Sequence, residues 1–262
     1  MAKPWAVILG SSSGFGASTA RAFAKAGHPI FGVHLDRRGT MPMVDALVEE
    51  LKGYDVPVVF VNTNAADEAK RADAITQLQA ACDESGSSVG MLLHSIAFGT
   101  LRPYFDAEGG PVLGKRHMDM TLDVMAHSLV YWAQDLLKAG LLTKGGRIFA
   151  MTSSGSLSAW PSYGAVSAAK CALESHIRQL AVELAPHGIT ANAIMAGVTQ
   201  TPALDKIPGS DLIVSKALAR NPSGRLTQPD DVAQAVLALS ASGTHWITGN
   251  VIKVDGGEAI CG

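Results

Sequence analysis

The sequence predicts an α/β protein built on a doubly wound, seven-stranded parallel sheet with helices on both faces. Short apolar runs alternate with longer amphipathic segments from one end of the 262 residues to the other. Regular alternation of this kind is typical of parallel strands joined by right-handed crossovers. Because such units of about 35 residues fill the chain, we expect a single domain over 1–262.

Apolar runs bounded by turn residues predict strands at 6–9, 30–35, 58–61, 89–95, 147–152, 189–195 and 250–254. The first helix follows a glycine turn and is expected to bury Ala20, Phe23 and Ala24 on one face. Further helices are expected around Val44 and Leu47 and at 68–81, 122–138, 162–184 and 230–240. Residues 201–226 fit neither pattern, because prolines and glycines surround a weak helix. We expect a mobile lid over a site there, with an ordinary long loop as the alternative.

Composition limits the classes of function that the chain can have. It holds 21 Lys and Arg against 23 Asp and Glu, a formal charge of −2, which lacks the basic excess of a nucleic-acid-binding protein. Three widely spaced cysteines suggest a reducing, cytoplasmic setting. No apolar run approaches the roughly 18 residues of a membrane span. Eight scattered histidines do not predict a metal site.

A glycine-rich turn joins the first predicted strand to the first helix. Glycines at such a turn let backbone N–H groups approach a pyrophosphate at the positive end of a helix. The sequence therefore predicts a site for a dinucleotide, either NAD(H) or NADP(H). The cofactor contacts expected in this turn are Gly10, Ser12, Ser13, Gly14, Phe15 and Gly16.

The Gly-x₃-Gly-x-Gly spacing of this turn differs from the more familiar Gly-x-Gly-x-x-Gly. It resembles the turn of the short-chain dehydrogenase/reductase (SDR) family, which implies a Rossmann fold. The resemblance covers essentially the whole chain and includes Val-Asp-Gly-Gly at 254–257. It implies two further sets of cofactor contacts, to adenine by Asn64 and Ala65 and to the adenine ribose by Ser95, Ile96 and Ala97.

Three interpretations of the residues after the second strand remain open. Asp36 lies 20 residues after Gly16, about the distance at which a carboxylate binds the ribose 2′-hydroxyl of NAD. Arg37 and Arg38 follow at once and could bind the 2′-phosphate of NADP. We expect the second strand to end near His34, which would place Asp36 beyond the ribose. The sequence therefore favours NADPH, with NADH as the alternative and a solvated turn as a third interpretation.

The predicted helix at 162–184 carries the candidate catalytic pair. The commonest SDR arrangement has a tyrosine four residues before its lysine, but Val166 stands there relative to Lys170. Tyr163 lies seven residues before the lysine, and seven helical residues turn by about 700°, so both side chains would share a face roughly 10 Å apart. This spacing moves the proton donor away from the carbon that accepts hydride. It suits an α,β-unsaturated thioester, in which charge develops on an enolate oxygen.

Tyr-x₆-Lys, together with His-Ser-Ile-Ala-Phe at 94–98 and Ala-Gly-Val-Thr-Gln-Thr at 196–201, resembles the enoyl-acyl-carrier-protein reductase branch of the SDRs. The resemblance implies that Tyr163 binds the enolate oxygen and that Lys170 holds the nicotinamide ribose. It also implies cofactor contacts at the second motif by Gly197, Thr199 and Thr201.

Three positions depart from familiar patterns or invite a catalytic interpretation. Ser153 stands where many of these reductases carry a second tyrosine, and we expect it to be a hydroxyl at the substrate, with a hydrogen bond to the local backbone alone as the alternative. Met125 occupies the place of the asparagine that ketone-reducing SDRs use in a water-mediated relay, so we expect that relay to be missing. His94 ends a predicted strand, where a packed and hydrogen-bonded histidine is the expectation rather than a catalytic one.

The sequence thus predicts reduction of the C2–C3 double bond of a 2-enoyl thioester by NAD(P)H, with acyl carrier protein or CoA as the thiol. The resemblance implies fatty-acid elongation as the setting and a homotetramer paired through two long helices. The alternatives are a carbonyl-reducing SDR, a specialised enoyl-CoA reductase and a non-catalytic dinucleotide sensor. Val166 and Met125 argue against the first of these, and the intact Tyr163–Lys170 pair argues against the last.

Overall fold

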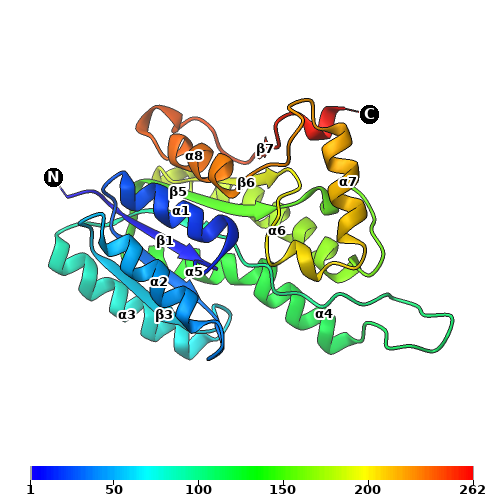
Figure 1. Cartoon of the computed structure of the whole chain (residues 1–262). Helices are drawn as coiled ribbons and strands as arrows, with labels where there is room; N and C mark the ends of the chain where they lie inside the picture. The colour runs from blue at the N-terminus through cyan, green and yellow to red at the C-terminus, as the bar shows by residue number, and fades with distance from the viewer. Residues whose placement is uncertain (1, 262) are drawn as a thin grey trace.

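The computed structural model describes residues 2–261 and confirms the predicted fold class. Seven parallel strands form one sheet in the order β3-β2-β1-β4-β5-β6-β7 (Figure 1). The order reverses between β1 and β4, which makes this a doubly wound Rossmann fold with a crevice at the carboxyl ends of those strands. The strands are β1 (Trp5–Leu9), β2 (Ile30–His34), β3 (Val58–Asn62), β4 (Val89–His94), β5 (Leu142–Thr152), β6 (Thr190–Ala196) and β7 (Val251–Val254).

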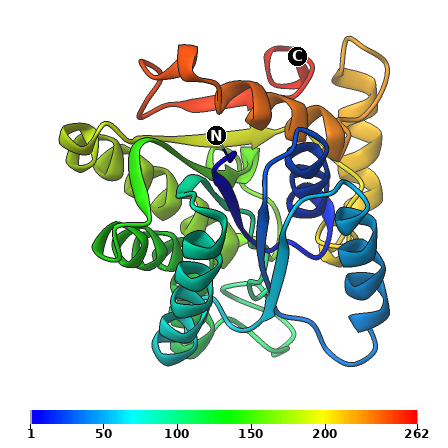
Figure 2. The same cartoon turned by 90° about the vertical axis from the view of Figure 1, so that its left-hand side faces the viewer.

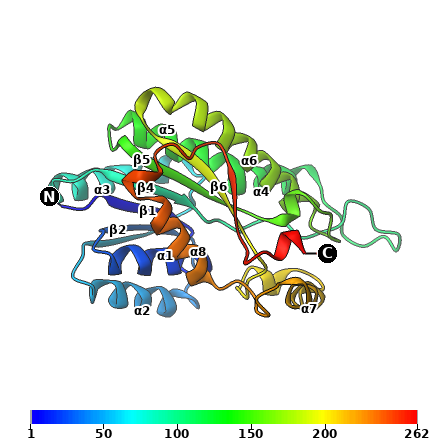
Figure 3. The same ribbon diagram turned by 90° about the horizontal axis from the view of Figure 1, so that it is seen from above.

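Helices cover both faces of the sheet (Figure 2). Viewed from above, α1, α2 and α8 lie on one side and α3, α5 and α6 on the other (Figure 3). The bounds are α1 (Gly14–Lys25), α2 (Met41–Lys52), α3 (Glu68–Ser85), α4 (Lys115–Leu122), α5 (Ser128–Lys138), α6 (Gly164–Glu183), α7 (Ser210–Arg220) and α8 (Pro229–Leu239).

Each face of the sheet has its own hydrophobic core, because alternate residues of a strand point to opposite faces. In β1, Val7 and Leu9 belong to the core beneath α3, α5 and α6, whereas Ala6 and Ile8 belong to the core beneath α1, α2 and α8. The predicted inner face of α1 is confirmed, since Phe23 is buried in the second of these cores. All five residues of β1 are buried, as expected for a central strand of a parallel sheet.

Two elements begin well before their predicted starts. The helix expected at 122–138 begins at Lys115 and contains a π-helical turn, Asp123–His127, between α4 and α5. Apolar periodicity does not mark such a turn, because one extra residue shifts the helical face without changing composition. The strand expected at 147–152 begins at Leu142 and runs through exposed residues that carry no apolar signal.

The segment 201–226 is more ordered than its turn residues suggest. It contains a 3₁₀ turn (Leu204–Lys206) followed by α7, which stands apart from both helix layers at the carboxyl edge of the sheet (Figure 1). Between β4 and α4, a long loop projects away from the body of the molecule (Figure 1). Among the helices of residues 2–261, none is long and apolar enough to cross a membrane.

Candidate active site

A cavity of about 590 Å³ opens at the carboxyl ends of β1, β4, β5 and β6. The loops that follow these strands line it, together with the segment that contains α7. This is the topological switch point of the sheet, where loops diverge to opposite faces and leave a crevice for a ligand. Every predicted site residue except Gly16 and Arg37 lines this one cavity.

The glycine turn approaches its neighbours too closely to accept side chains. Gly10 has a φ of +85°, and a Cβ there would lie 2.4 Å from the carbonyl oxygen of Ser95. A Cβ on Gly16 would lie 2.0 Å from the carbonyl oxygen of Gly10. Gly16 therefore packs α1 closely against the turn and is not among the residues that line the cavity, and its role as a cofactor contact stays a prediction.

The N-terminus of α1 is open towards the cavity. Its N-cap, Ser13, makes no side-chain capping bond, and the first turn holds no acidic residue. The free N–H groups and the positive end of the helix dipole therefore remain available to an anion. Ser12, Gly14 and Phe15 complete this part of the lining, and together these groups could hold a pyrophosphate.

Asp36 lines the cavity although β2 ends two residues earlier, at His34. Its Oδ2 lies 3.0 Å from Nδ1 of His34, so the carboxylate folds back towards the strand end. Burial by itself would raise the pKa of Asp36, but hydrogen bonds from Ser12, Thr40 and His34 outweigh it and hold that pKa below its ordinary value. Arg37 is exposed and is not among the residues that line the cavity, and its role as a cofactor contact stays a prediction.

The residues predicted to contact adenine and its ribose line the same cavity as Asp36. Asn64 Oδ1 accepts a hydrogen bond of 3.0 Å from the N–H of Ala66, and Trp132 Nε1 donates to the carbonyl oxygen of Ala65 at 3.0 Å. These bonds fix the loop after β3. Ser95, Ile96 and Ala97, which follow β4, line the adjacent wall.

The candidate catalytic hydroxyls lie together at the other end. Ser153 Oγ and the phenol oxygen of Tyr163 are 3.4 Å apart, and the N–H of Gly155 donates to Ser153 Oγ at 3.2 Å. Tyr163 is the N-cap of α6 rather than a residue of its first turn, so it precedes the helix that was expected to carry it. Ser162 before it adopts a φ of +62°, a strained conformation for a residue with a side chain.

Burial governs the ionisation of the catalytic pair. Burial raises the pKa of Tyr163, and the hydrogen bond with Ser153 partly opposes that change. Burial lowers the pKa of Lys170 to about 8, against the opposing attraction of Glu174. Lys170 Nζ donates a hydrogen bond of 2.7 Å to the carbonyl oxygen of Met151, which anchors the lysine beside the end of β5.

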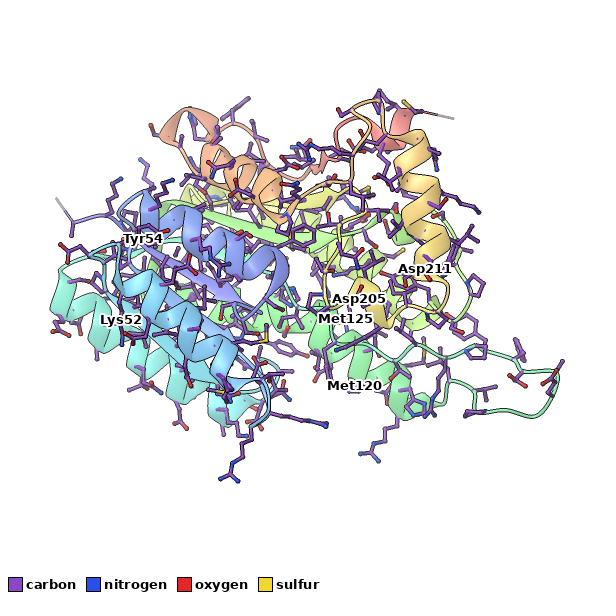
Figure 4. The ribbon with its side chains drawn as sticks, viewed as in Figure 1. Lys52, Tyr54, Met120, Met125, Asp205 and Asp211 are labelled. Carbon is purple, nitrogen blue, oxygen red and sulfur yellow. The ribbon has the colours of Figure 1, made fainter. Side chains whose placement is uncertain are left out.

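The wall next to Tyr163 is apolar where ketone-reducing SDRs have a polar relay. Met125 and Val166 form a small buried cluster with Ala169, and Tyr163 packs against it. Met125 lies in the interior, on the π-helical turn that leads into α5 (Figure 4). The sulfur and methyl groups of this cluster neither donate nor relay a proton.

His94 behaves as the sequence led us to expect. It is fully buried, lies outside the cavity lining, and places Nε2 2.9 Å from Oγ of Ser128. The Ser128 hydroxyl itself donates to the carbonyl oxygen of Val124 at 2.8 Å. Burial lowers the pKa of His94 to about 3, so the ring is neutral and part of the packing.

The last part of the site lies on the loop after β6 and on the segment that follows it. Gly197, Thr199 and Thr201 line the cavity as predicted, and Thr199 Oγ1 donates to the carbonyl oxygen of Gly197 at 3.0 Å. Sequence reasoning missed four charged residues of the lining, because they come from segments without a recognised motif. They are Lys206, Lys216, Arg220 and Glu258.

Comparisons with known proteins agree with this geometry. A family model described as Enoyl-(Acyl carrier protein) reductase matches residues 10–258. The chain is 30% identical to an NADH-dependent enoyl-[acyl-carrier-protein] reductase of Aquifex aeolicus, over 84% of this chain and 79% of that one. It is 29% identical to 1-cyclohexenylcarbonyl-CoA reductase of Streptomyces collinus, over 97% of this chain and 86% of that one.

The solved structure of the Aquifex aeolicus enoyl reductase superposes with a TM-score of 0.81 at 26% identity, covering 99% of this chain and 97% of that one. A 3-oxoacyl-[acyl-carrier-protein] reductase of Thermotoga maritima is also similar, at 24% identity over 97% of each chain. The likeness thus includes both enoyl-reducing and ketone-reducing enzymes. The chain belongs to the short-chain dehydrogenase/reductase family of oxidoreductases and resembles its enoyl reductase branch.

Proposed function

We propose that this chain reduces the C2–C3 double bond of a 2-enoyl thioester with a nicotinamide cofactor. The observation that carries the proposal is the catalytic end of the cavity. There Tyr163 stands seven residues before Lys170, and Met125 and Val166 form an apolar wall where a ketone-reducing enzyme needs polar groups. A donor set back in this way suits charge that develops on the thioester oxygen, three bonds away from the C3 carbon that receives hydride.

The cavity fits a dinucleotide along its whole length. The turn at Gly10 and the free end of α1 suit a pyrophosphate, and Asp36 and Tyr163 both line the same cavity. The cofactor, when bound, supplies a hydride to C3 of the enoyl group. Tyr163 then donates a hydrogen bond to the thioester oxygen as it becomes an enolate, and Ser153 orients the phenol. The enolate returns to a thioester carbonyl when C2 takes a proton, which the Tyr163 phenol or water supplies, so that one hydride and one proton add across the double bond. The buried ammonium of Lys170 holds the nicotinamide ribose and stabilises the negative charge.

We further propose that NADH is the preferred cofactor, a reversal of the preference drawn from the sequence. The Asp36 carboxylate lines the cavity, and its lowered pKa keeps it ionised at neutral pH. A 2′-phosphate at this end would meet a like charge, whereas a 2′-hydroxyl can donate to the carboxylate. Arg37, the residue that was expected to bind the phosphate, is exposed outside the lining.

The lid segment supports a thioester substrate. Leu204, Ile207 and Ile213 offer an apolar wall for an acyl chain, while Lys206 and Lys216 add positive charge to the same lining. A chain carried on phosphopantetheine, in acyl carrier protein or in CoA, would present both features, an apolar tail and a phosphate. Assembly as a homotetramer through α5 and α6 remains part of the proposal.

The lid segment, residues 201–226, contacts the loop between β5 and α6. Trp160 Nε1 donates to the carbonyl oxygen of Pro208 at 3.0 Å, and the ammonium of Lys216 lies 5.6 Å from the centre of the Trp160 ring. A bond to a loop carbonyl and a cation–π contact are weak enough to break during substrate entry. This arrangement suits a lid that closes over the acyl chain.

The decisive experiment is cofactor oxidation by the purified protein with a 2-enoyl-CoA and a 3-ketoacyl-CoA, each with NADH and with NADPH. We expect turnover of the enoyl substrate with NADH. Loss of this turnover in Tyr163→Phe would support the role of the phenol. Turnover of the ketone alone would overturn the proposal.

One observation favours a second candidate, reduction of a 3-ketoacyl thioester. The Ser153–Tyr163 pair, with hydroxyls 3.4 Å apart, could also bind a carbonyl oxygen directly. The ketone arm of the same assay tests this candidate, and we expect it to be slower than the enoyl arm because Met125 and Val166 leave no polar route for the proton.

A further inference from the structure

The segment after β7 brings a carboxylate into the cavity. Glu258 opens a short 3₁₀ turn (Glu258–Ile260), and its side chain lines the cavity beside Gly197 and Thr199. Glu258 Oε2 accepts a hydrogen bond of 3.0 Å from the backbone N–H of Val198. The carboxylate thus binds the peptide that follows β6, the same loop that carries the predicted contacts to the nicotinamide half of the cofactor.

The loop leaves room for this contact only because residue 197 is glycine. A Cβ there would lie 2.8 Å from Glu258 Oε2 and 2.4 Å from Thr227 Oγ1. On its other side the loop is held by the bond from Thr199 Oγ1 to the carbonyl oxygen of Gly197. The peptide that joins Gly197 to Val198 is therefore held at both of its polar groups: its carbonyl oxygen, on Gly197, accepts from Thr199, and its N–H, on Val198, donates to Glu258.

The turn that carries Glu258 is itself well anchored. Both carboxylate oxygens of Asp255 accept backbone bonds at 3.0 Å, from the N–H groups of Gly257 and Ala259. Arg220, the last residue of α7, donates to the carbonyl oxygen of Cys261 at 2.8 Å. The C-terminal segment therefore lies against the end of α7 (Figure 1) and delivers the Glu258 carboxylate from a fixed position.

We propose that Glu258 is a positioning residue for the nicotinamide half of the cofactor and acts by holding the Gly197–Val198 peptide in place. The inference rests on the proposed function, because it assumes that the nicotinamide lies at this end of the cavity. Burial raises the pKa of Glu258 and the bond from Val198 opposes that rise, as expected for a carboxyl group held inside a cavity by a backbone donor.

The test compares NADH with ADP-ribose, which has the adenosine and both phosphates but lacks the nicotinamide. In fluorescence or calorimetric titrations we expect Glu258→Ala to weaken NADH binding about five- to tenfold, the effect of one lost hydrogen bond of ordinary strength. ADP-ribose binding should stay within about twofold of the wild type. Glu258→Gln keeps an oxygen acceptor for Val198 and should restore NADH binding to within about threefold.

Ile260→Ala is the matched control, because Ile260 lies on the same turn with an exposed side chain that makes no polar contact. Thermal unfolding of each variant establishes that it is folded before titration. Equal weakening of NADH and ADP-ribose, no weakening of NADH, or a Gln variant as weak as the Ala variant would each overturn the proposal. Failure of the wild type to reduce an enoyl thioester would refute the proposed function and leave this binding test intact.

Discussion

Lys170 donates a 2.7 Å hydrogen bond from its buried ammonium group to the carbonyl oxygen of Met151, at the end of β5. This contact, together with the hydrogen bond from Thr152 Oγ1 to Glu174, ties α6 to the strand that Ser153 follows. Burial lowers the pKa of Lys170 to about 8, within two units of neutrality. Lys170 is proposed to stabilise negative charge, yet its pKa lies only slightly above neutral pH, so a small rise in pH removes the positive charge that this role requires.

The pH dependence of turnover should report this lysine. As pH rises through about 8, Lys170 loses its proton, and we expect kcat for the enoyl substrate to fall about tenfold per unit above that value. Steady-state rates between pH 6 and 10, at saturating substrate and cofactor, measure this. A rate that stays level to pH 10 would contradict the assignment.

Replacement of this lysine should also change the pH dependence of stability. The pKa of about 8 in the folded protein lies below the ordinary 10.5, so the unfolded chain binds more protons between these pH values and stability rises with pH across them. The free energy of unfolding of wild type relative to Lys170→Met should therefore increase by about 2 kcal/mol from pH 7 to pH 9.5. Urea unfolding of the cofactor-free proteins at both pH values measures this difference, and a constant difference would refute it.

Tyr163→Phe tests the role of the phenol. We expect kcat to fall by about 10²- to 10⁴-fold, the usual contribution of a positioned proton donor, while the dissociation constant of NADH stays within about twofold. Ser153→Ala should have a smaller effect, about tenfold, because it only orients the phenol. Tyr54→Phe is the matched control, since Tyr54 lies on the far side of the molecule from Met125 and α7 (Figure 4). Equal loss in Tyr54→Phe would point to a general effect on the fold.

Asp36 should govern the choice of cofactor. Wild type should have a higher kcat/KM with NADH than with NADPH, and Asp36→Ala should lower the NADH/NADPH ratio at least tenfold, because it removes both an acceptor for the 2′-hydroxyl and a charge that repels the 2′-phosphate. Arg37→Ala provides the comparison, since that side chain is exposed outside the cavity lining. A larger change in Arg37→Ala than in Asp36→Ala would support the original NADPH interpretation.

Gly16→Ala should destabilise the protein even though only one methyl group is added. The new Cβ would lie 2.0 Å from the carbonyl oxygen of Gly10, so α1 or the turn has to shift, at a cost of about 1–3 kcal/mol. NADH binding should weaken as well, because the turn carries the pyrophosphate site. Gly39→Ala, where nothing lies within 4 Å of the added Cβ, should change neither property. Thermal unfolding and NADH titration of both variants measure this.

Local sequence determined the parts of this protein that depend on short-range chemistry. The periodicity of strands and helices is set by neighbouring residues. The seven strands and a doubly wound parallel sheet could therefore be predicted from the sequence. Two short-range spacings also predicted parts of the cavity lining, because each depends on one turn or on the start of one helix. They are the spacing of the glycines at 10, 14 and 16 and the spacing of Tyr163 and Lys170.

Only the tertiary structure decided the remainder of the site, because those contacts join segments far apart in the chain. Glu258 meets Val198 across 60 residues, and α7 brings Lys216 to the same cavity as Tyr163. The number of residues after Gly16 could not show whether Asp36 or Arg37 lies at the cavity. The side chain that folds back to the end of β2 is decided by the hydrogen-bond partners present there. The positions of these side chains are set by hydrogen bonds and close packing between elements that are distant in the sequence, and no local sequence pattern encodes such contacts.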